Sequence, residues 1–252
     1  YGWNFIGGPN GKNVGPDTYE ATRVYGALKY KYENADPAKL NKSQKKEYDT
    51  FIRAKENVEK EVAKAKSNLS QLTLVEGKVM ASLTDLEKAM SGKTFDIATL
   101  EKLETSDNQS LTMAKNIAMQ YLSASDVTSI EGIKETIKGE IEQDKKASQT
   151  KLDFAFNTEF DPRKTIVMDN YNDPTEKYYG NNDVEGPDPL HGTHVGGIIG
   201  AARKKEIGMD GVAPNVKFMS VRAVPDGDER DKDVANAIRY AVDNGASVIN
   251  MS

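Results

Sequence analysis

Two histidines, the only ones in the chain, lie three residues apart at the start of an apolar segment. They are His191 and His194 within residues 190–202, which read LHGTHVGGIIGAA. Regular spacing of the apolar residues predicts a helix here, and an imidazole at its first turn can act as a general acid and base near neutral pH. We expect the apolar positions to bury this helix and to leave the ring of His191 in a cleft.

Two non-catalytic interpretations of these histidines are also considered. A lone histidine is more often a buried residue bonded to backbone than a reactive one, and the flanking motif is what favours reactivity for His191. The pair also forms His-x-x-His, a spacing that can bind a metal ion. The chain has no cysteine, and no glutamate adjoins the histidines as in zinc peptidases. We therefore expect no metal here, and a structural, supporting role for His194.

Three blocks of sequence together resemble the subtilisin-like serine peptidases, the subtilase or peptidase S8 family. The blocks are the histidine segment, residues 210–214 (DGVAP), and residues 245–252 (GASVINMS). They occur in the family's order and roughly at its spacing. The resemblance implies an α/β fold, here a partial parallel sheet with flanking helices. It also implies endopeptidase activity on polypeptide substrates.

The resemblance implies a catalytic triad in the chain order Asp, His, Ser. His191 matches the family's histidine, and Gly192 and His194 match its neighbours. The family's serine belongs to a Gly-Thr-Ser-Met motif beyond the strand that ends at Ser252, and no Gly-Thr-Ser occurs here. Residues 1–5 (YGWNF) resemble sequence that follows the family's aspartate. We therefore expect an internal part of a longer peptidase, inactive by itself.

Asp169 is the alternative candidate for the triad carboxylate. It follows residues 165–168, whose β-branched side chains predict a short strand upstream of the histidine. The sequence MDNY around it lacks the Ser/Thr-Gly pair that follows the family's aspartate. A turn-forming or structural role is the favoured interpretation of Asp169.

Two further sites follow from neighbouring residues. Ser252 ends a predicted strand, residues 246–251, and by the family match it borders the substrate-binding pocket. Asn182, Asp183 and Asp188 flank the histidine loop. A solvated turn is the favoured interpretation of these three, with a weakly signalled calcium site as the alternative. No other cofactor is expected.

Composition divides the chain into three parts. Residues 1–17 and 152–252, rich in glycine and proline, are expected to form the peptidase domain, and residues 18–151, rich in lysine, glutamate and leucine, to form a helical insertion. Ser43 is a candidate N-cap of its first long helix and Gly92 a candidate stop. Apolar residues recur every seven positions in this helix, which is typical of a coiled-coil seam. They are Phe51, Val58, Ala65, Leu72, Val79 and Leu86.

Three shorter apolar stripes follow, at residues 97–103, 111–121 and 130–141. Because a single long helix would leave its apolar seam in water, we expect these segments to pack back on it as an antiparallel hairpin or small bundle. Three roles remain open for the insertion: a structural arm, a lid over the cleft, and a docking arm for a partner.

The C-terminal part predicts alternating strands and helices. We expect a helix from His191 to about Arg203, a strand over residues 216–221, and a helix that is capped by Asp231 or Asp233 and runs through Val242. A left-handed turn at Asn244-Gly245 then leads to the strand over residues 246–251. This order implies a right-handed parallel unit.

Composition excludes some classes of partner. The net charge is −5, so the chain offers no overall basic character for nucleic acid. No apolar run is long enough to span a bilayer. The family resemblance implies a secreted or bacterial cell-envelope location. The alternative function is a non-catalytic relative whose helical insertion is an interaction module; substrate preference and oligomeric state stay open.

Overall fold

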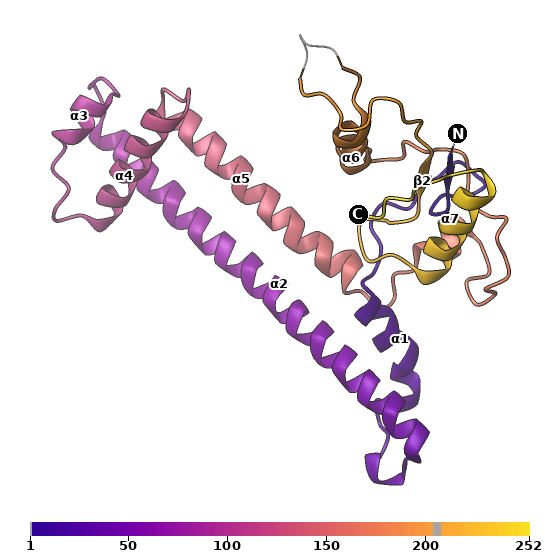
Figure 1. Cartoon of the computed structure of the whole chain (residues 1–252). Helices are drawn as coiled ribbons and strands as arrows, with labels where there is room; N and C mark the ends of the chain where they lie inside the picture. Colours follow the sequence, from indigo (N-terminus) through magenta and orange to yellow (C-terminus); the bar gives the residue numbers. More distant parts are fainter. Residues whose placement is uncertain (1, 204–207) are drawn as a thin grey trace. The chain divides into compact units, whose positions relative to one another are not determined.

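The computed structural model describes residues 2–203 and 208–252, which divide into two compact units. The helical unit is Glu59–Leu152, and the mixed unit combines Tyr1–Val58 with Asp153–Ser252. Figure 1 shows the elements along the chain. Each unit has its own hydrophobic core.

Four helices build the helical unit. They are the C-terminal part of α2 (Lys42–Ala89), α3 (Ile97–Glu101), α4 (Gln109–Ala124) and α5 (Ile130–Thr150). Buried apolar residues of α2, α4 and α5 share one core, which includes Leu83, Ala118 and Ile133. The expected helices after residue 92 are therefore confirmed.

Two ion pairs fix the direction of α5 along α2. Glu76 pairs with Lys145, and Glu87 pairs with Lys134 at 2.6 Å. From the first pair to the second, the residue number rises in α2 and falls in α5. The two helices are therefore antiparallel, as Figure 1 also shows. Of the heptad positions, Ala65 and Leu86 are buried, whereas Leu72 and Val79 are only partly buried.

The start of α2 differs from the expectation. The Asn41 side chain accepts from the Gln44 amide at 3.0 Å, and the Gln44 side chain accepts from the Asn41 amide at 2.9 Å. This reciprocal pair is a capping box, so Asn41 and not Ser43 caps the helix. The stop is confirmed, since α2 ends at Ala89 and Gly92 has a φ of +75°.

The mixed unit contains a parallel pair of short strands, β1 (Gly2–Asn4) and β2 (Ser220–Arg222), with Trp3 opposite Val221. Phe5, Ile6, Val14, Val167 and Tyr179 form its core. Helix α7 (Asp231–Asp243) packs there through Tyr240, whose ring stacks on Trp3 at a centroid distance of 6.3 Å. A further helix of this unit, α1 (Glu20–Tyr32), packs on the beginning of α2 through Tyr25, Tyr32 and Phe51.

Three expected strands are wrong in whole or part. Residues 246–251 are irregular, and only the end of segment 216–221 is extended, as β2. A strand exists through hydrogen bonds to a neighbouring strand. In the described residues the one sheet has two strands, β1 and β2, and segment 246–251 is not part of it. Arg163–Val167 is a π-helical turn instead of the strand expected over residues 165–168. Within residues 208–252 the expected parallel unit around α7 is therefore not formed.

The polar side of α7 faces inward. Lys232, Asp233 and Asn236 are buried, whereas Ile238 and Val242 are exposed. The N-cap is Arg230, so neither expected aspartate caps the helix. Asp233 instead lies in its first turn with its carboxylate in the core. The expected left-handed turn after α7 is confirmed by a φ of +86° at Gly245.

Met168 has a φ of +58°, in the left-handed region that side chains other than glycine and asparagine rarely adopt. We expect Met168→Asn to raise the free energy of unfolding by about 0.5–1 kcal/mol, because asparagine tolerates this region. Met168→Val should lower it by about 1 kcal/mol, because β-branching adds strain. Urea unfolding of both variants measures the difference, and equal midpoints would contradict it.

No helix in the described part of the chain is both long and apolar enough to cross a lipid bilayer.

Candidate active site

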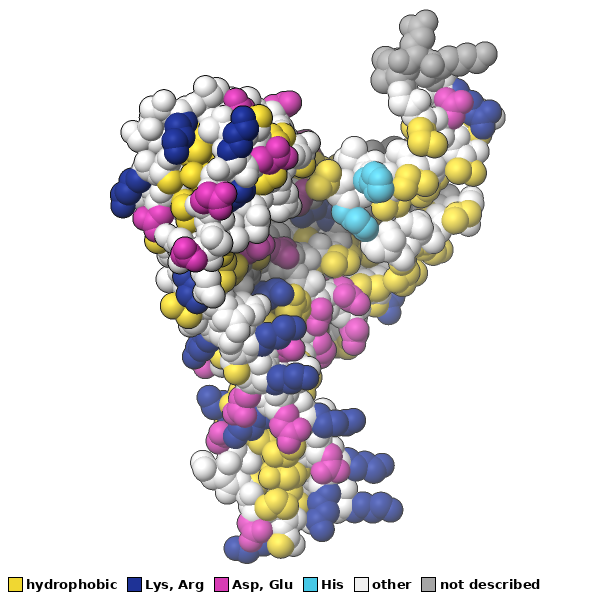
Figure 2. Space-filling view, turned by 90° about the vertical axis from the view of Figure 1, so that its left-hand side faces the viewer, with side chains coloured by type: hydrophobic (Ala, Val, Ile, Leu, Met, Phe, Trp, Pro, Cys, Tyr) yellow, Lys and Arg dark blue, Asp and Glu magenta, His cyan; other side chains and the backbone are white. Residues whose placement is uncertain are grey.

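Both histidines lie on α6 (Leu190–Gly200) and are exposed. Their side chains are the two cyan groups on the surface in Figure 2, next to apolar side chains. The expectation that apolar residues bury this helix is wrong for the described chain, since Ile198 is 57% exposed and Val195 and Ile199 are only partly buried. In the described residues nothing packs over these positions closely enough to bury them. Gly192 is exposed between the two histidines.

The C-terminal end of α6 is held by the DGVAP block. The amides of Gly211, Val212 and Ala213 donate to the carbonyls of Ala201, Ile198 and Ile199 at 3.1, 3.1 and 2.8 Å, respectively. These carbonyls have no partner inside the helix, so the block supplies their hydrogen bonds. A Cβ on Gly211 would lie 2.2 Å from the amide nitrogen of Ala201, which requires glycine at this close approach.

The N-terminal side of α6 is linked to β1 by a chain of polar contacts. Asn4 is fully buried, and its side chain donates to Asn181 at 2.9 Å and to Asn13 at 2.6 Å. The backbones of Asn4 and Asn181 also exchange hydrogen bonds at 2.9 and 3.0 Å. Asp183 accepts from the side chain of Asn13 and from the amide of Gly186. These bonds order the loop that leads to the histidines.

Two of the three residues considered for calcium, Asp183 and Asp188, accept hydrogen bonds from backbone amides of this loop. Hydrogen bonds from Gly186 and then from Asn13 hold the pKa of Asp183 below its usual range. Asp188 accepts from the amide of Leu190 at 2.9 Å, directly before α6. No group of three or more acidic, histidine or cysteine side chains that could hold a metal ion occurs among the described residues. The bonds of Asp183 and Asp188 are of the kind found in Asx turns, whereas the interpretation of Asn182 stays a prediction.

Asp169 belongs to a buried cluster of charges that the sequence did not indicate. Arg163 donates to both oxygens of Asp169 at 2.8 Å and to both oxygens of Asp233 at 2.5 and 2.8 Å. The Nζ of Lys232 donates to Asp169 and to Glu176, each at 2.7 Å. The side chains of Asp169 and Asp233 are fully buried. This buried cluster joins the turn after Pro162 to α7.

The same cluster explains why segment 165–168 is not a strand. Arg163 and Asp169 are six residues apart and make a bidentate pair. In an extended strand their Cα atoms would be roughly 20 Å apart, beyond reach of one another. The π-helical turn and the left-handed Met168 bring the two together. In the described chain the hydrogen bonds of Asp169 go to Arg163 and Lys232, and none goes to His191.

Rings and a second ion pair complete the buried cluster. The Tyr179 hydroxyl donates to Asp233 at 2.7 Å, and Asn236 donates to that hydroxyl at 3.1 Å. Burial first, and then the charge of Asp233, raise the pKa of Tyr179 well above its usual range. Arg230 forms a bidentate pair with Asp17 at 2.8 and 2.9 Å. The Tyr171 ring lies against the guanidinium groups of both Arg163 and Arg230.

Stability should fall in acid because of Asp169. Burial alone would raise the pKa of Asp169, but hydrogen bonds from Arg163 and Lys232 outweigh burial and lower it. The folded pKa is then below the unfolded value of about 3.9, so this stability is present above about pH 4 and is lost as pH falls through the folded pKa. Urea midpoints at pH 6, 4 and 3 measure the loss. Asp169→Asn should show a shallower pH dependence; an unchanged slope would contradict the assignment.

Ser252 lies exposed at the end of the irregular segment 246–251. Its hydroxyl accepts from the Asn250 side chain at 3.2 Å. Its expected place beside a substrate pocket stays a prediction.

Residues 72–252 match the family model described as the subtilase family. This match covers well over half of the chain and includes the histidine helix and the DGVAP block. The chain belongs to the subtilase family.

Proteins from several organisms are similar to parts of this chain. A thermophilic serine proteinase of Bacillus sp. (strain AK1) is 48% identical over 63 residues, which is 25% of this chain and 16% of that protein. The halolysin-like extracellular serine protease Nep of Natrialba magadii is 43% identical over 63 residues, 25% of this chain and 12% of that protein. Thermitase of Thermoactinomyces vulgaris is 36% identical over 95 residues, 35% of this chain and 34% of that protein.

The chain therefore spans between 12% and 34% of the length of these three proteins. No solved structure matches the chain. For this subtilase, the sequence did not indicate the capping role of the DGVAP block or the buried cluster. One signal for the cluster was available in three adjacent charged residues, Asp231, Lys232 and Asp233. Consecutive residues point in different directions around a helix axis, so on a helix that packs against the protein these three side chains cannot all face solvent equally.

Proposed function

We propose that the full-length protein is a serine endopeptidase and that this chain supplies its general acid and base, His191. The observation that carries the proposal is the HGTH segment on α6 in a chain of the subtilase family. The polypeptide backbone is the substrate class. An exposed imidazole at the first turn of a helix is accessible to a substrate and to a nucleophile from elsewhere in the protein.

In the proposed reaction the serine hydroxyl attacks the peptide carbonyl and gives its proton to His191. The imidazolium then donates that proton to the nitrogen of the departing amine as the C–N bond breaks. A water molecule then gives a proton to His191, attacks the carbonyl of the acyl-serine ester and releases the acyl group. His194 and Gly192 support the helix turn that holds the ring. Asp169 is not proposed as the triad carboxylate, because two buried cations already take both of its oxygens.

We also propose that residues 18–151 are an insertion in the domain formed by residues 1–17 and 152–252. The parallel pairing of β1 with β2 supports this assignment, because it joins residues on both sides of the insertion in one sheet. The heptad pattern and the antiparallel α2 and α5 support a coiled-coil hairpin within it. Ser252 is proposed to border the substrate edge that extended peptides pair with.

A location outside the cytoplasm is proposed from relatives. The Natrialba magadii protein is named extracellular, and the Bacillus subtilis (strain 168) relative is named a cell wall-associated protease. Substrates of the full-length protein would then be polypeptides of the cell exterior.

A fluorophosphonate probe tests the proposed activity, because it forms a covalent bond only with an activated serine. The full-length protein should be labelled, and its sequence should contain Asp-Ser/Thr-Gly before residue 1 and Gly-Thr-Ser after residue 252. If the folded full-length protein resists the probe and lacks either motif, the non-catalytic alternative replaces the proposal. In that alternative, the helical unit is an interaction module.

A further inference from the structure

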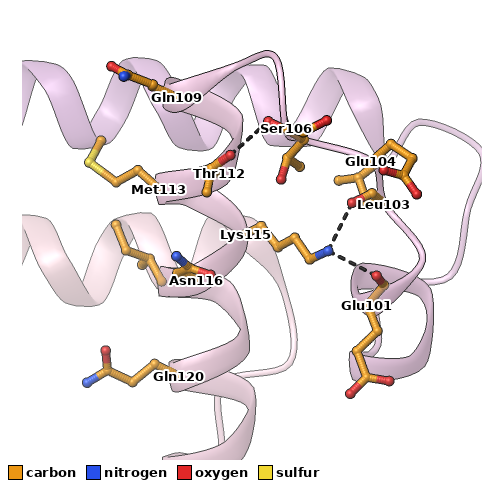
Figure 3. A pocket seen from close by; sticks show the side chains of 12 residues that line it. Glu101, Leu103, Glu104, Ser106, Gln109, Thr112, Met113, Lys115, Asn116 and Gln120 are labelled. Atoms are coloured by element: carbon orange, nitrogen blue, oxygen red, sulfur yellow. Dashed lines mark hydrogen bonds between the residues drawn. The ribbon is translucent and has the colours of Figure 1, made fainter.

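An open groove lies in the helical unit between α4 and the segment after α3 (Figure 3). One wall is the outward face of α4, and the other is the backbone of residues 101–106. The groove is separate from the histidine helix, which belongs to the mixed unit. Nothing in the proposed peptide hydrolysis uses its residues.

The second wall is held in place by two side chains of α4. The Nζ of Lys115 donates to the carbonyls of Glu101 and Leu103 at 3.0 and 2.9 Å. The Thr112 hydroxyl donates to the carbonyl of Thr105 at 2.8 Å. These bonds, drawn in Figure 3, tie an otherwise irregular segment to a helix. The groove is therefore ordered before any ligand binds, which lowers the entropy lost on binding.

The α4 wall combines exposed amides with apolar side chains. Gln109, Asn116 and Gln120 are exposed and occupy one face of the helix, with Met113 and Ile117 between them. A primary amide both donates and accepts hydrogen bonds, as a peptide backbone does. Methionine adapts its shape to varied apolar partners. The wall therefore suits a polypeptide backbone whose side chains vary.

The charged residues that line the groove are Glu101, Glu104 and Lys115, so two carboxylates face one ammonium group and the lining has a net charge of −1. In the described part of the chain no ion pair is formed by either carboxylate. The one lining cation, Lys115, directs its protons to backbone carbonyls. Carboxylates placed beside amides attract cationic side chains and disfavour acidic ones.

We propose that this groove binds an extended polypeptide segment that carries lysine or arginine. From Gln109 to Gln120 the helix rises about 16 Å, at 1.5 Å per residue. An extended chain covers that length with about five residues. Where the proposed peptidase function holds, this segment belongs to the substrate, and binding here raises the substrate's local concentration at the enzyme.

The test is a binding measurement on the whole chain. The probe is a fluorescein-labelled, unstructured decapeptide of alternating lysine and serine, with fluorescence anisotropy as the readout. The matched peptide replaces each lysine by glutamate. We expect the lysine peptide to bind at least tenfold more tightly than the glutamate peptide, and raised salt to weaken it.

Two double variants locate the binding site. Glu101→Gln with Glu104→Gln should weaken the lysine peptide about fivefold, as expected for two exposed charge contacts. The control, Glu135→Gln with Glu142→Gln, removes the same charge from exposed positions of α5 and should leave affinity unchanged. Asn116→Leu with Gln120→Leu should weaken binding of the lysine peptide and of the glutamate peptide. It removes the side-chain amides that are proposed to bond to the peptide backbone.

Equal loss in the α5 control, or equal binding of both peptides, would overturn the proposal. Thermal unfolding of each variant verifies that the fold is retained, and all the altered side chains are exposed. Because binding needs no nucleophile, its outcome is independent of fluorophosphonate labelling. Failure of one proposal is thus distinguishable from failure of the other.

Discussion

Replacing His191 by alanine in the full-length protein is expected to lower kcat for peptide hydrolysis by a factor on the order of 10⁶, the loss found when a subtilisin loses its histidine. Without the imidazole, the serine hydroxyl keeps its proton and the departing amine receives none. The side chain is exposed, so its removal should leave the free energy of unfolding within about 0.5 kcal/mol of the parent. Hydrolysis of a chromogenic peptide and urea unfolding measure the two quantities.

His194→Ala is the matched control for this variant. It removes the same side chain from the next turn of α6, where the ring is also exposed. We expect a loss of kcat smaller by several powers of ten, since His194 is assigned no proton transfer. Equal activity losses in the two variants would contradict the assignment of the general base to His191. A fully active His191→Ala enzyme would reject the proposed chemistry.

Replacing Arg163 by methionine is expected to destabilise the mixed unit by about 3–5 kcal/mol. Arg163 contacts two fully buried carboxylates, and its own side chain is only 5% exposed. Methionine fills much of the volume but leaves Asp233 with no buried cation bonded to it in the described contacts, while Asp169 keeps Lys232. Urea unfolding at pH 7, followed by tyrosine and tryptophan fluorescence, reports the change.

Lys164→Met provides the control next in sequence. Lys164 is 81% exposed and forms only a 3.4 Å surface pair with Asp161. Its replacement should change the free energy of unfolding by less than about 1 kcal/mol. Similar losses in the two variants would mean that the buried cluster does not hold the mixed unit together. Adding Asp233→Asn to Arg163→Met should recover part of the loss, because it removes the uncompensated charge.

The helical unit was predictable from local pattern. Ile133, Ile137 and Ile141 repeat at helical spacing and are buried in α5, and Gly92 ends the preceding helix with a positive φ. Such features depend on residues near one another in sequence, where apolar spacing and backbone preference act directly. The capping box at Asn41 follows the same local rules, yet Ser43 is an equally good cap by residue type, and only the hydrogen bonds of Gln44 decide between them.

The sheet was less predictable because a strand depends on its partner. Residues 246–251 have strand-forming side chains and remain irregular, whereas Gly2–Asn4, with no such pattern, forms β1 through β2. Similarly, the β-branched residues before Met168 form a tight turn. The free energy of placing Arg163 between two carboxylates outweighs their local preference.

By itself, the sequence determined the family, the candidate general base His191 and the helical character of the insertion, because each rests on residue types at short spacing. Only the tertiary structure decided that Asp169 is bound by Arg163 and Lys232, and that residues 211–213 close the end of the histidine helix. Lys232 and Asp169 are 63 residues apart, and the other contacts join positions that only the fold of the chain between them brings together. Buried charges and unpaired carbonyls need hydrogen-bond partners. A local sequence pattern does not show which residues supply them.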